Sequence, residues 1–402
     1  MKRLLMGVLL VGLIAFLGAE PLANALRRPP TVRWQAPTEV AAGVPFTVVL
    51  EADQNVHYAV RYAGQERQQE GREVALSFVG EVGQQQVDIV VTDARAQRHQ
   101  MSTPTYGLPG VVPLLQAPRE VLPGQAFMAR VQVPSALVTA ADVTVSIALA
   151  DEPQTLLLYD VADDPAWQNH IDANASLVAL GSVPLGTPAG EVTLDITVRD
   201  RFGRQTVRRH PLTVLPDERP LETLSIPAEL LPQASSDNRA FEEATLLDVA
   251  GSGSARPLWQ APFILPVEGE PTSLFGDWRR YSSENTPRYH TGHDIAALVG
   301  TPVLAANDGV VVLTGDFPIR GGLVVIDHGA SVFSHYAHLE GYDVREGDVV
   351  SQGDVIARVG STGMSTGPHL HWEMRIGNQP TAPLEWVGQM LPSSQMQALA
   401  SN

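Results

Sequence analysis

The sequence predicts an all-β protein in which two tandem β-sandwich domains precede a third domain rich in antiparallel β-sheet. Three observations lead to this fold class. Glycine and proline are plentiful, at 34 and 31 of 402 residues, and both favour the turns that join short strands. Apolar and polar residues alternate in many short segments, which is typical of half-buried strands. The content of 44% hydrophobic and 18% charged residues is that of a globular chain.

The N-terminus is predicted to be an export signal. A basic start precedes an apolar run from Leu4 to about Gly18, and an Ala-x-Ala cleavage pattern ends at Ala25. The run is shorter than the roughly 20 residues that span a bilayer. We therefore expect a signal peptide over residues 1–25, with an uncleaved membrane anchor as the alternative. Both interpretations place the rest of the chain outside the cytoplasm. We expect it to be periplasmic or secreted and associated with the cell wall, and cleavage would leave no membrane contact.

Two repeated segments mark the tandem domains. The pattern Gln-Ala-Pro-x-Glu-Val-x-x-Gly-x-x-Phe occurs at 35–46 and again at 116–127. The pattern Asp-Ile-x-Val-x-Asp occurs at 88–93 and again at 195–200. Both segments have the apolar alternation of strands and are bounded by glycine and proline.

Each repeat unit has the length of a β-sandwich, which predicts domains over residues 26–107 and 108–216. In pattern they resemble bacterial immunoglobulin-like modules. We expect them to act as spacers that hold the rest of the chain away from the cell surface. Binding to a wall polymer or to a partner protein is the alternative.

Residues 217–258 are predicted to be a linker with a short helix. Ser236-Asp237 can cap a helix over Ala240–Val249, and the Gly-Ser-Gly-Ser run at 251–254 then interrupts regular structure. Short strands with Gly and Asp turns fill the third domain, residues 259–392, before a flexible tail at 393–402. Its strands are expected at Val310–Thr314, Leu323–Asp327, Val332–His338, Val355–Val359 and Leu370–Arg375.

Charge and composition exclude several classes of function. The formal net charge is −17 and Lys2 is the only lysine, so neither a nucleic acid nor an anionic membrane is expected as a partner. A biotinyl or lipoyl carrier domain is excluded too, because it needs a lysine to modify. Cysteine is absent, which leaves no disulfide, cysteine nucleophile or thiolate metal site. A metal site must therefore use histidine and carboxylate ligands.

Histidines gather in the third domain. Seven of the 11 lie after residue 289: His290, His293, His328, His335, His338, His369 and His371. On an extended chain His290 and Asp294 share one face, and Gly292 keeps the space between them free. His369 and His371 also share one face. Two imidazoles and one carboxylate from these pairs can bind a tetrahedral metal and leave a fourth position for water, which suits zinc.

Three motifs follow one another in this domain. They are His-x-Gly-x-Asp at 290–294, Tyr-x-His-Leu at 336–339 and Gly-Ser-Thr-Gly-x-Ser-Thr-Gly-Pro-His-Leu-His at 360–371. In type and order they resemble the motifs of the lysostaphin-like (LytM-type) zinc metallopeptidases, which cut the peptide part of bacterial peptidoglycan. The resemblance covers roughly residues 259–390. It implies an exported zinc endopeptidase that hydrolyses stem peptides or cross-bridges of peptidoglycan during cell wall remodelling or lysis.

The resemblance also implies roles for five residues. His290, Asp294 and His371 would bind Zn²⁺, and His338 and His369 would lie beside the metal-bound water and the scissile carbonyl. One neutral imidazole could take the proton of the water and return it to the leaving amine. The other could stabilise the oxyanion. The sequence leaves open which histidine does which.

Members of this family often carry a tyrosine a few residues before the first ligand. Here Glu284 stands six residues before His290, so Tyr281, Tyr289 or Arg280 is the candidate substitute.

Four other polar residues near the motifs are expected to support the site or the fold. His293 has the opposite strand parity and is expected to be a neighbour of the site. His328 and His335 are expected to be structural or exposed. Glu373 shares the face of the His-x-His pair, where it can bond a ligand histidine.

The alternative function is a catalytically silent protein that binds the wall or activates a separate amidase. Degenerate relatives usually lose metal ligands, whereas all five expected positions are intact here, which favours the enzyme. Diaminopimelate cross-links, glycine bridges and stem peptides are all candidate substrates. The sequence makes no prediction about oligomeric state.

Overall fold

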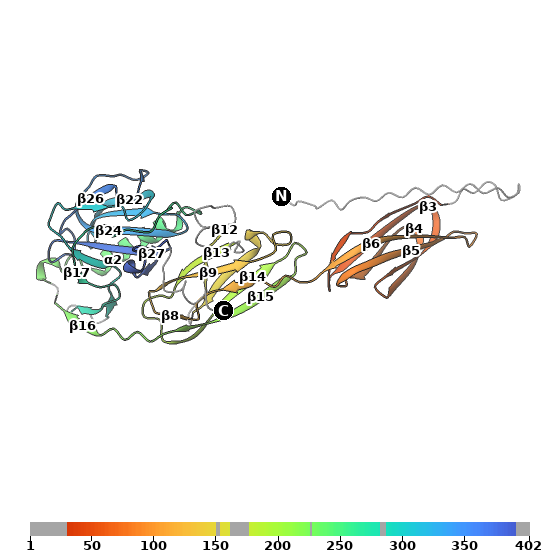
Figure 1. Cartoon of the computed structure of the whole chain (residues 1–402), viewed down its shortest axis with the longest axis horizontal. Helices are drawn as coiled ribbons and strands as arrows, with labels where there is room; N and C mark the ends of the chain where they lie inside the picture. The colour runs from red at the N-terminus through yellow and green to blue at the C-terminus, as the bar shows by residue number, and fades with distance from the viewer. Residues whose placement is uncertain (1–29, 150–152, 161–176, 226, 282–286, 391–402) are drawn as a thin grey trace. The chain divides into compact units, whose positions relative to one another are not determined.

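The computed structural model is mostly β (Figure 1). It describes residues 30–149, 153–160, 177–225, 227–281 and 287–390. The predicted signal and the predicted tail lie outside these ranges. No helix within them is long and apolar enough to span a bilayer. The chain forms two compact units, one of residues 1–111 and 199–206 and one of residues 112–198 and 207–402.

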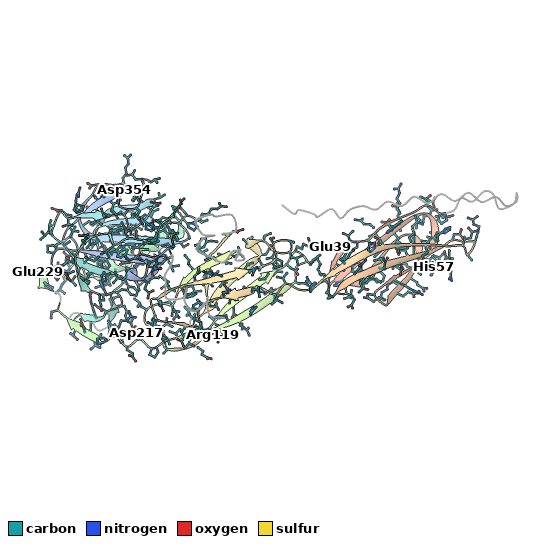
Figure 2. The ribbon with its side chains drawn as sticks, in the orientation of Figure 1. Glu39, His57, Arg119, Asp217, Glu229 and Asp354 are labelled. Carbon is teal, nitrogen blue, oxygen red and sulfur yellow. The ribbon has the colours of Figure 1, made fainter. Side chains whose placement is uncertain are left out.

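The first unit contains a six-stranded sheet. Its strands are β1 (Val32–Gln35), β2 (Glu39–Ala41), β3 (Pro45–Tyr62), β4 (Gln65–Val79), β5 (Gly83–Thr92) and β6 (Arg98–Leu108). The long strand β3 pairs with β1, β4 and β5, all antiparallel. His57 of β3, labelled in Figure 2, is exposed. Its neighbours Val56 and Tyr58 are buried, as the period of two along a strand requires.

Nine strands in two sheets follow in the second unit. They are β7 (Leu114–Gln116), β8 (Glu120–Val121), β9 (Ala126–Gln132), β10 (Val143–Ala148), β11 (Pro153–Leu156), β12 (Leu158–Asp160), β13 (Leu177–Ser182), β14 (Gly190–Arg199) and β15 (Gln205–Val214). One sheet has the order β11-β10-β14-β15-β8 and the other the order β12-β13-β9-β7. The regions predicted to be rich in strands are therefore β structure.

The repeated segments form the same local structure twice. The Glu-Val pair of the first pattern lies on β2 and on β8, and each of these strands pairs in parallel with the end of a later strand, β6 or β15. The last aspartate of the second pattern closes a turn. Asp93 accepts two backbone N–H groups at 2.9 and 3.0 Å, and Asp200 accepts two at 3.0 Å. Similar sequence thus encodes similar pairing and similar turns.

The segment between residues 217 and 258 contributes a strand and a helix. Strand β16 (Leu221–Leu224) pairs in parallel with β18 (Trp278–Tyr281). Helix α2 (Ser236–Gly251) begins four residues before the expected range, because Ser235 rather than Ser236 caps it by accepting the N–H of Asn238. Its Leu246 packs in a buried cluster with residues of the neighbouring sheet, such as Leu323 and Phe333.

The predicted third domain contains a ten-stranded sheet of order β17-β20-β27-β24-β23-β22-β25, with β21, β26 and β28 paired beside this path. The strands are β17 (Glu270–Ser273), β20 (His293–Ala296), β21 (Pro302–Leu304), β22 (Gly309–Phe317), β23 (Gly321–Asp327), β24 (Val332–Tyr342), β25 (Val349–Val350), β26 (Val355–Val359), β27 (His369–Ile376) and β28 (Gln379–Thr381), while β19 (Arg288–Tyr289) pairs with β18. All five strands expected here are confirmed as β22, β23, β24, β26 and β27. Buried aromatic residues, including Trp259, Phe263, Tyr336, Trp372 and Trp386, fill the core.

Strand β27 runs between β20 and β24 and aligns the predicted site residues. In the register of these three strands, His371 of β27 lies opposite Asp294 of β20 and opposite Ala337 of β24. Strand pairing thereby brings the first and the last of the three sequence motifs together.

Candidate metal centre

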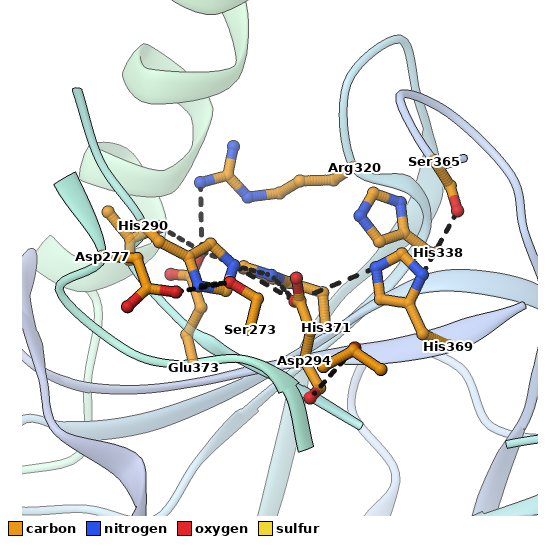
Figure 3. A network of polar contacts seen from close by, with 12 residues as sticks. Ser273, Asp277, His290, Asp294, Arg320, His338, Ser365, His369, His371 and Glu373 are labelled. Atoms are coloured by element: carbon orange, nitrogen blue, oxygen red, sulfur yellow. Dashed lines mark hydrogen bonds and ion pairs between the residues drawn. The ribbon is translucent and has the colours of Figure 1, made fainter. Parts of the chain in front are cut away.

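Three predicted ligand side chains converge at the edge of β20 and β27. Their ligand atoms all lie within 4.8 Å of one another. Oδ1 of Asp294 is 3.1 Å from Nε2 of His290 and 2.8 Å from Nδ1 of His371, and the two imidazole nitrogens are 3.1 Å apart (Figure 3). Two nitrogens and one oxygen facing a common point are a donor set that zinc accepts.

The chain around His290 fixes which of its nitrogens faces this point. Nδ1 lies 2.9 Å from the carbonyl oxygen of Leu274, an acceptor, so Nδ1 carries the proton that it donates there. Nε2 is then left with a lone pair toward Asp294 and His371. Gly292 permits the close approach, because a Cβ at this position would lie 2.6 Å from Cε1 of His371. The expectation that Gly292 clears the space is confirmed.

His371 is held between two carboxylates. Its Nδ1 faces Asp294, and its Nε2 lies 3.0 Å from Oε1 of Glu373. Burial favours the neutral imidazole, but the hydrogen bonds with Asp294 and Glu373 outweigh it and raise the pKa of His371 to about 9. Burial also opposes the charge of Asp294, yet the close contacts of the carboxylate with His290 and His371 hold the pKa of that carboxyl well below its usual range. A metal at this point would therefore replace a proton on Nδ1 of His371.

Glu373 is the centre of a buried charge network. It is fully buried, and Oε1 also accepts the hydroxyl proton of Thr291 at 2.9 Å. Arg375 donates to its Oε2 at 2.6 Å, and Arg320 lies 3.4 Å from its Oε1. Although burial raises the pKa of Glu373, the two guanidinium groups lower it further, and the carboxylate stays charged. The expected bond from Glu373 to a ligand histidine is present, and it orients the ring of His371.

The two predicted proton-transfer histidines lie together beside the three ligands. The ring centroids of His338 and His369 are 4.7 Å apart, and Nε2 of His369 is 3.8 Å from Oδ1 of Asp294. Nδ1 of His338 bonds the carbonyl of Thr362 at 2.8 Å, and Nδ1 of His369 bonds the carbonyl of Gly367 at 2.7 Å. Both carbonyls are acceptors, so each Nδ1 carries a proton and each Nε2 keeps a free lone pair.

His338 has an unusual backbone and a shifted pKa. Its φ is +62°, in the left-handed region that non-glycine residues rarely adopt. Such conformations persist where surrounding contacts hold them, and here the N–H of His338 donates to the carbonyl of Arg320 at 2.7 Å. Burial and the nearby charges of His371 and His369 lower the pKa of His338 to about 3. The imidazole is therefore neutral near pH 7.

All five residues line one cavity of about 740 Å³. Four arginines also line it, namely Arg239, Arg279, Arg288 and Arg320. Glu243 and Glu373 line it as well, so the cavity presents side chains of both charges beside the three ligand side chains.

Three residues were candidates to replace the tyrosine that the resemblance leads one to expect before the first ligand. Tyr289 lines the cavity, and its ring stacks on Trp278 with centroids 5.4 Å apart. Arg280 lies on β18 opposite Thr223 of β16. Tyr281 ends the same strand, and Glu284 lies outside the described residues.

The remaining histidines of the domain are buried. His328 bonds the carbonyl of Asp308 and the hydroxyl of Ser334, each at 2.7 Å, so its expected structural role is supported and the exposed alternative is wrong. His335 is buried with Nδ1 3.6 Å from Oε2 of Glu373. His293 is buried next to the ligand Asp294 on β20.

Two charged residues near the site were not expected from the sequence. Arg375 had a detectable signal, because residues 369, 371, 373 and 375 alternate along one strand and share a face. Arg320 had none, since it follows β22 in a turn and reaches Glu373 from 53 residues away.

The similarity to known proteins lies in the part of the chain that contains the site. Residues 288–383 match the family described as Peptidase family M23. The DD-carboxypeptidase/endopeptidase Mpg of Neisseria meningitidis serogroup B is 48% identical over 113 residues, which are 28% of this chain and 26% of that protein. The peptidoglycan DD-endopeptidase ShyA of Vibrio cholerae serotype O1 is 45% identical over 91 residues, 23% of this chain and 21% of that protein.

Among solved structures, the catalytic domain of the antimicrobial peptidase lysostaphin from Staphylococcus simulans is 30% identical, with a TM-score of 0.27, over 29% of this chain and 90% of that one. The matches to the two curated relatives span about a quarter of each relative's length. The match to the family includes all five predicted site residues. Residues 288–383 of this chain are therefore a domain of peptidase family M23.

Proposed function

We propose that this chain is an exported, zinc-dependent endopeptidase that hydrolyses peptide bonds in peptidoglycan. The observation that carries the proposal is the convergence of His290, Asp294 and His371 on one point, beside two histidines whose Nε2 atoms are free. The match of residues 288–383 to the family and the activities named for its relatives support the same reaction and substrate class.

The three converging side chains are assigned as the protein ligands of Zn²⁺. They supply Nε2 of His290, Oδ1 of Asp294 and Nδ1 of His371, and the buried Glu373 holds the ring of His371 from its other side. A bound zinc ion supplies Lewis acidity, which makes water more acidic and a carbonyl more electrophilic. Three protein ligands leave room for water and substrate, as in other catalytic zinc sites.

His338 and His369 are assigned to proton transfer and to stabilisation of negative charge. Each presents an unprotonated Nε2 in the cavity, because its Nδ1–H is tied to a backbone carbonyl. One of them takes a proton from the attacking water and delivers it to the leaving amine. The other, once protonated, donates to the oxygen on which charge develops.

The substrate is assigned to the cross-linked peptides of the cell wall. Mpg is named as a DD-carboxypeptidase/endopeptidase and ShyA as a peptidoglycan DD-endopeptidase, and both names support a peptide substrate from the wall. The export signal and the two N-terminal β domains fit an extracytoplasmic protein. We assign these domains as immunoglobulin-like spacers, with wall binding as their alternative role.

A second candidate is a catalytically silent protein that binds the wall or activates an amidase. The intact His290, Asp294 and His371 set argues for the enzyme, because a silent protein has no need to keep three converging ligands.

Digestion of purified sacculi tests the proposal. The full mature chain, loaded with zinc, is incubated with sacculi, and the products are analysed by muropeptide mass spectrometry. New amino and carboxyl ends at one type of peptide bond, absent with the His371→Ala variant, are the expected result. Binding to sacculi by a zinc-loaded chain that releases no new ends would instead establish the silent candidate.

A further inference from the structure

Helix α2 is linked to the metal centre by a buried carboxylate. Glu242, on its second turn, is only 1% exposed. Its Oε1 accepts the backbone N–H of Ile319 at 2.6 Å, and its Oε2 accepts from the guanidinium of Arg320 at 2.9 Å. Both carboxylate oxygens are therefore used to hold the turn between β22 and β23.

Arg320 continues the contact toward the metal ligands. One of its terminal nitrogens bonds Glu242. The other lies 3.4 Å from Oε1 of Glu373, and Figure 3 shows these two side chains. That oxygen also accepts from Nε2 of His371, whose Nδ1 faces Asp294. An unbroken line of charged groups thus joins the helix to a metal ligand. Arg320 bonds Glu242 and Glu373 at the same time only while both carboxylates keep their positions. The orientation of its guanidinium group therefore depends on Glu242.

The backbone of the same turn leads to a second site residue. The carbonyl of Arg320 accepts the N–H of His338, which has the left-handed backbone described above. The carbonyl of Ile319 accepts the N–H of Met364, in the loop that leads to His369. The turn held by Glu242 therefore supports the proton-transfer histidine as well as the metal ligand.

The four charged groups of this line balance one another. Glu242 and Glu373 carry two negative charges, and Arg320 and Arg375 carry two positive charges, and all four side chains are largely or fully buried. Buried ion pairs rarely add stability relative to apolar packing, but they fix geometry, and loss of one partner leaves a charge uncompensated. A role in fixing the metal centre accounts for burying a carboxylate on a helix that could otherwise pack with apolar residues alone.

We propose that Glu242 is a positioning residue for His371 and His338, and that helix α2 is a working part of the metal centre. The helix lies outside residues 288–383, the part that matches the family. The expected effect of Glu242 on hydrolysis rests on the proposed function. The expected effect of Glu242 on zinc affinity does not.

The test compares Glu242→Gln with Asp248→Asn in the full chain. The Glu242→Gln change keeps the size of the side chain and an acceptor for the N–H of Ile319, but it removes the charge that holds Arg320. Asp248 is an exposed acidic residue of the same helix, so its amide variant is the matched control. Zinc affinity is measured by competition with a chromogenic chelator, and the geometry of the site by the visible absorption of the Co²⁺-substituted protein.

We expect Glu242→Gln to weaken zinc binding about tenfold and to alter the cobalt spectrum, with kcat lowered more than KM is raised, whereas Asp248→Asn matches the wild type. Glu242→Asp keeps the negative charge but has a shorter side chain, so the guanidinium of Arg320 still has a counter-charge in the folded protein. This variant should therefore show a smaller loss of zinc affinity and a smaller change in the cobalt spectrum. It replaces the amide variant if that variant does not fold.

A purely structural Glu242 would give the opposite pattern. Its variants would melt at a lower temperature but bind zinc and absorb light as the wild type does, and this result would overturn the proposal. If the wild-type chain hydrolyses no wall peptide, the proposed function fails. The metal affinity and the cobalt spectrum still decide the role of Glu242.

Discussion

Asp294 and His371 face each other across strands β20 and β27, with Oδ1 and Nδ1 2.8 Å apart although 77 residues separate them in the sequence. Strand pairing, rather than a loop, therefore sets the distance between these two predicted ligands. Each side chain has a second fixed contact, with His290 for the aspartate and with Glu373 for the histidine. The site is preorganised, so a metal ion needs to displace only a proton and not to rearrange the chain.

The assignment of ligands and proton-transfer groups predicts two classes of variant. Alanine at His290, Asp294 or His371 removes one of three protein ligands, so zinc should be lost or strongly weakened and activity with it. Alanine at His338 or His369 leaves three ligands in place, so zinc should remain while kcat falls about 10²–10⁴-fold.

Metal analysis of the five folded variants by mass spectrometry distinguishes these classes. Circular dichroism of each variant is the control for folding. An empty site in His369→Ala together with a filled site in His371→Ala would reverse the assignment of that pair. Zinc retained by all five variants would place the metal elsewhere.

Gly292 predicts a steric effect on the ligand beside it. A Cβ at this position would lie 2.6 Å from Cε1 of His371 and 2.8 Å from the carbonyl oxygen of Trp372. Gly292→Ala should therefore displace the imidazole, weaken zinc binding at least tenfold and destabilise the fold by about 1–3 kcal/mol.

The matched control is Gly367→Ala, in the loop before His369. A Cβ at Gly367 would meet nothing within 4 Å, and its φ lies outside the left-handed region. Zinc titration and thermal unfolding of the two variants check the prediction. Equal zinc affinity in both variants would mean that the strands move apart enough to accept the methyl group.

The sequence pattern was enough to predict β24 and β27 near the site, but β20 was not among the expected strands. His369 and His371 had to share a face because they are two apart on a strand, and β27 confirms this. The opposition of Asp294 and His371 required the pairing of β20 with β27, which no local pattern contains. The family resemblance grouped His371 with His290 and Asp294 as ligands but predicted no strand pairing, and spacing alone left the choice between His369 and His371 open.

The support of the site was much harder to predict. Arg320 and Glu242 act across 53 and 77 residues of sequence, and neither lies in a motif. Glu242 was an ordinary acidic residue of a segment predicted to be a linker, since nothing in the sequence shows which side of a short helix is buried. Such contacts depend on tertiary packing, which overrides local propensity.

His328 predicts how stability depends on pH. Burial lowers the pKa of His328 to about 4, and its two polar contacts fit one neutral tautomer, in which Nδ1–H donates to the carbonyl of Asp308. The unfolded chain binds a proton near pH 6.5, so between about pH 6.5 and 4 the unfolded state holds more protons than the folded state. The free energy of unfolding should therefore fall as the pH falls through this window, by about 1.4 kcal/mol per pH unit from this residue.

Urea unfolding of metal-free protein at several pH values checks this slope. His328→Asn can still donate to the carbonyl of Asp308 but cannot be protonated, so its slope should be shallower than that of the wild type. His335 has its pKa lowered by burial as well, and it contributes a slope of the same sign in both proteins. Identical slopes for the two proteins would mean that His328 is not held neutral in the folded state.

Glu373→Gln should separate the charge of the buried network from its shape. The amide fits the same space and can still accept from Nε2 of His371, but it leaves Arg375 and Arg320 without their shared counter-charge. Because an unpaired buried charge typically costs about 3–5 kcal/mol, the free energy of unfolding should drop by that order. Zinc affinity should fall about 10–100-fold, since a carboxylate partner makes the ligand imidazole more basic.

Chemical unfolding measures the stability and chelator competition measures the zinc affinity of the Glu373→Gln variant. The control is Glu340→Gln, at an exposed residue of β24. If Glu373→Gln loses stability but binds zinc as tightly as the control, the carboxylate serves the fold and not the metal ligand.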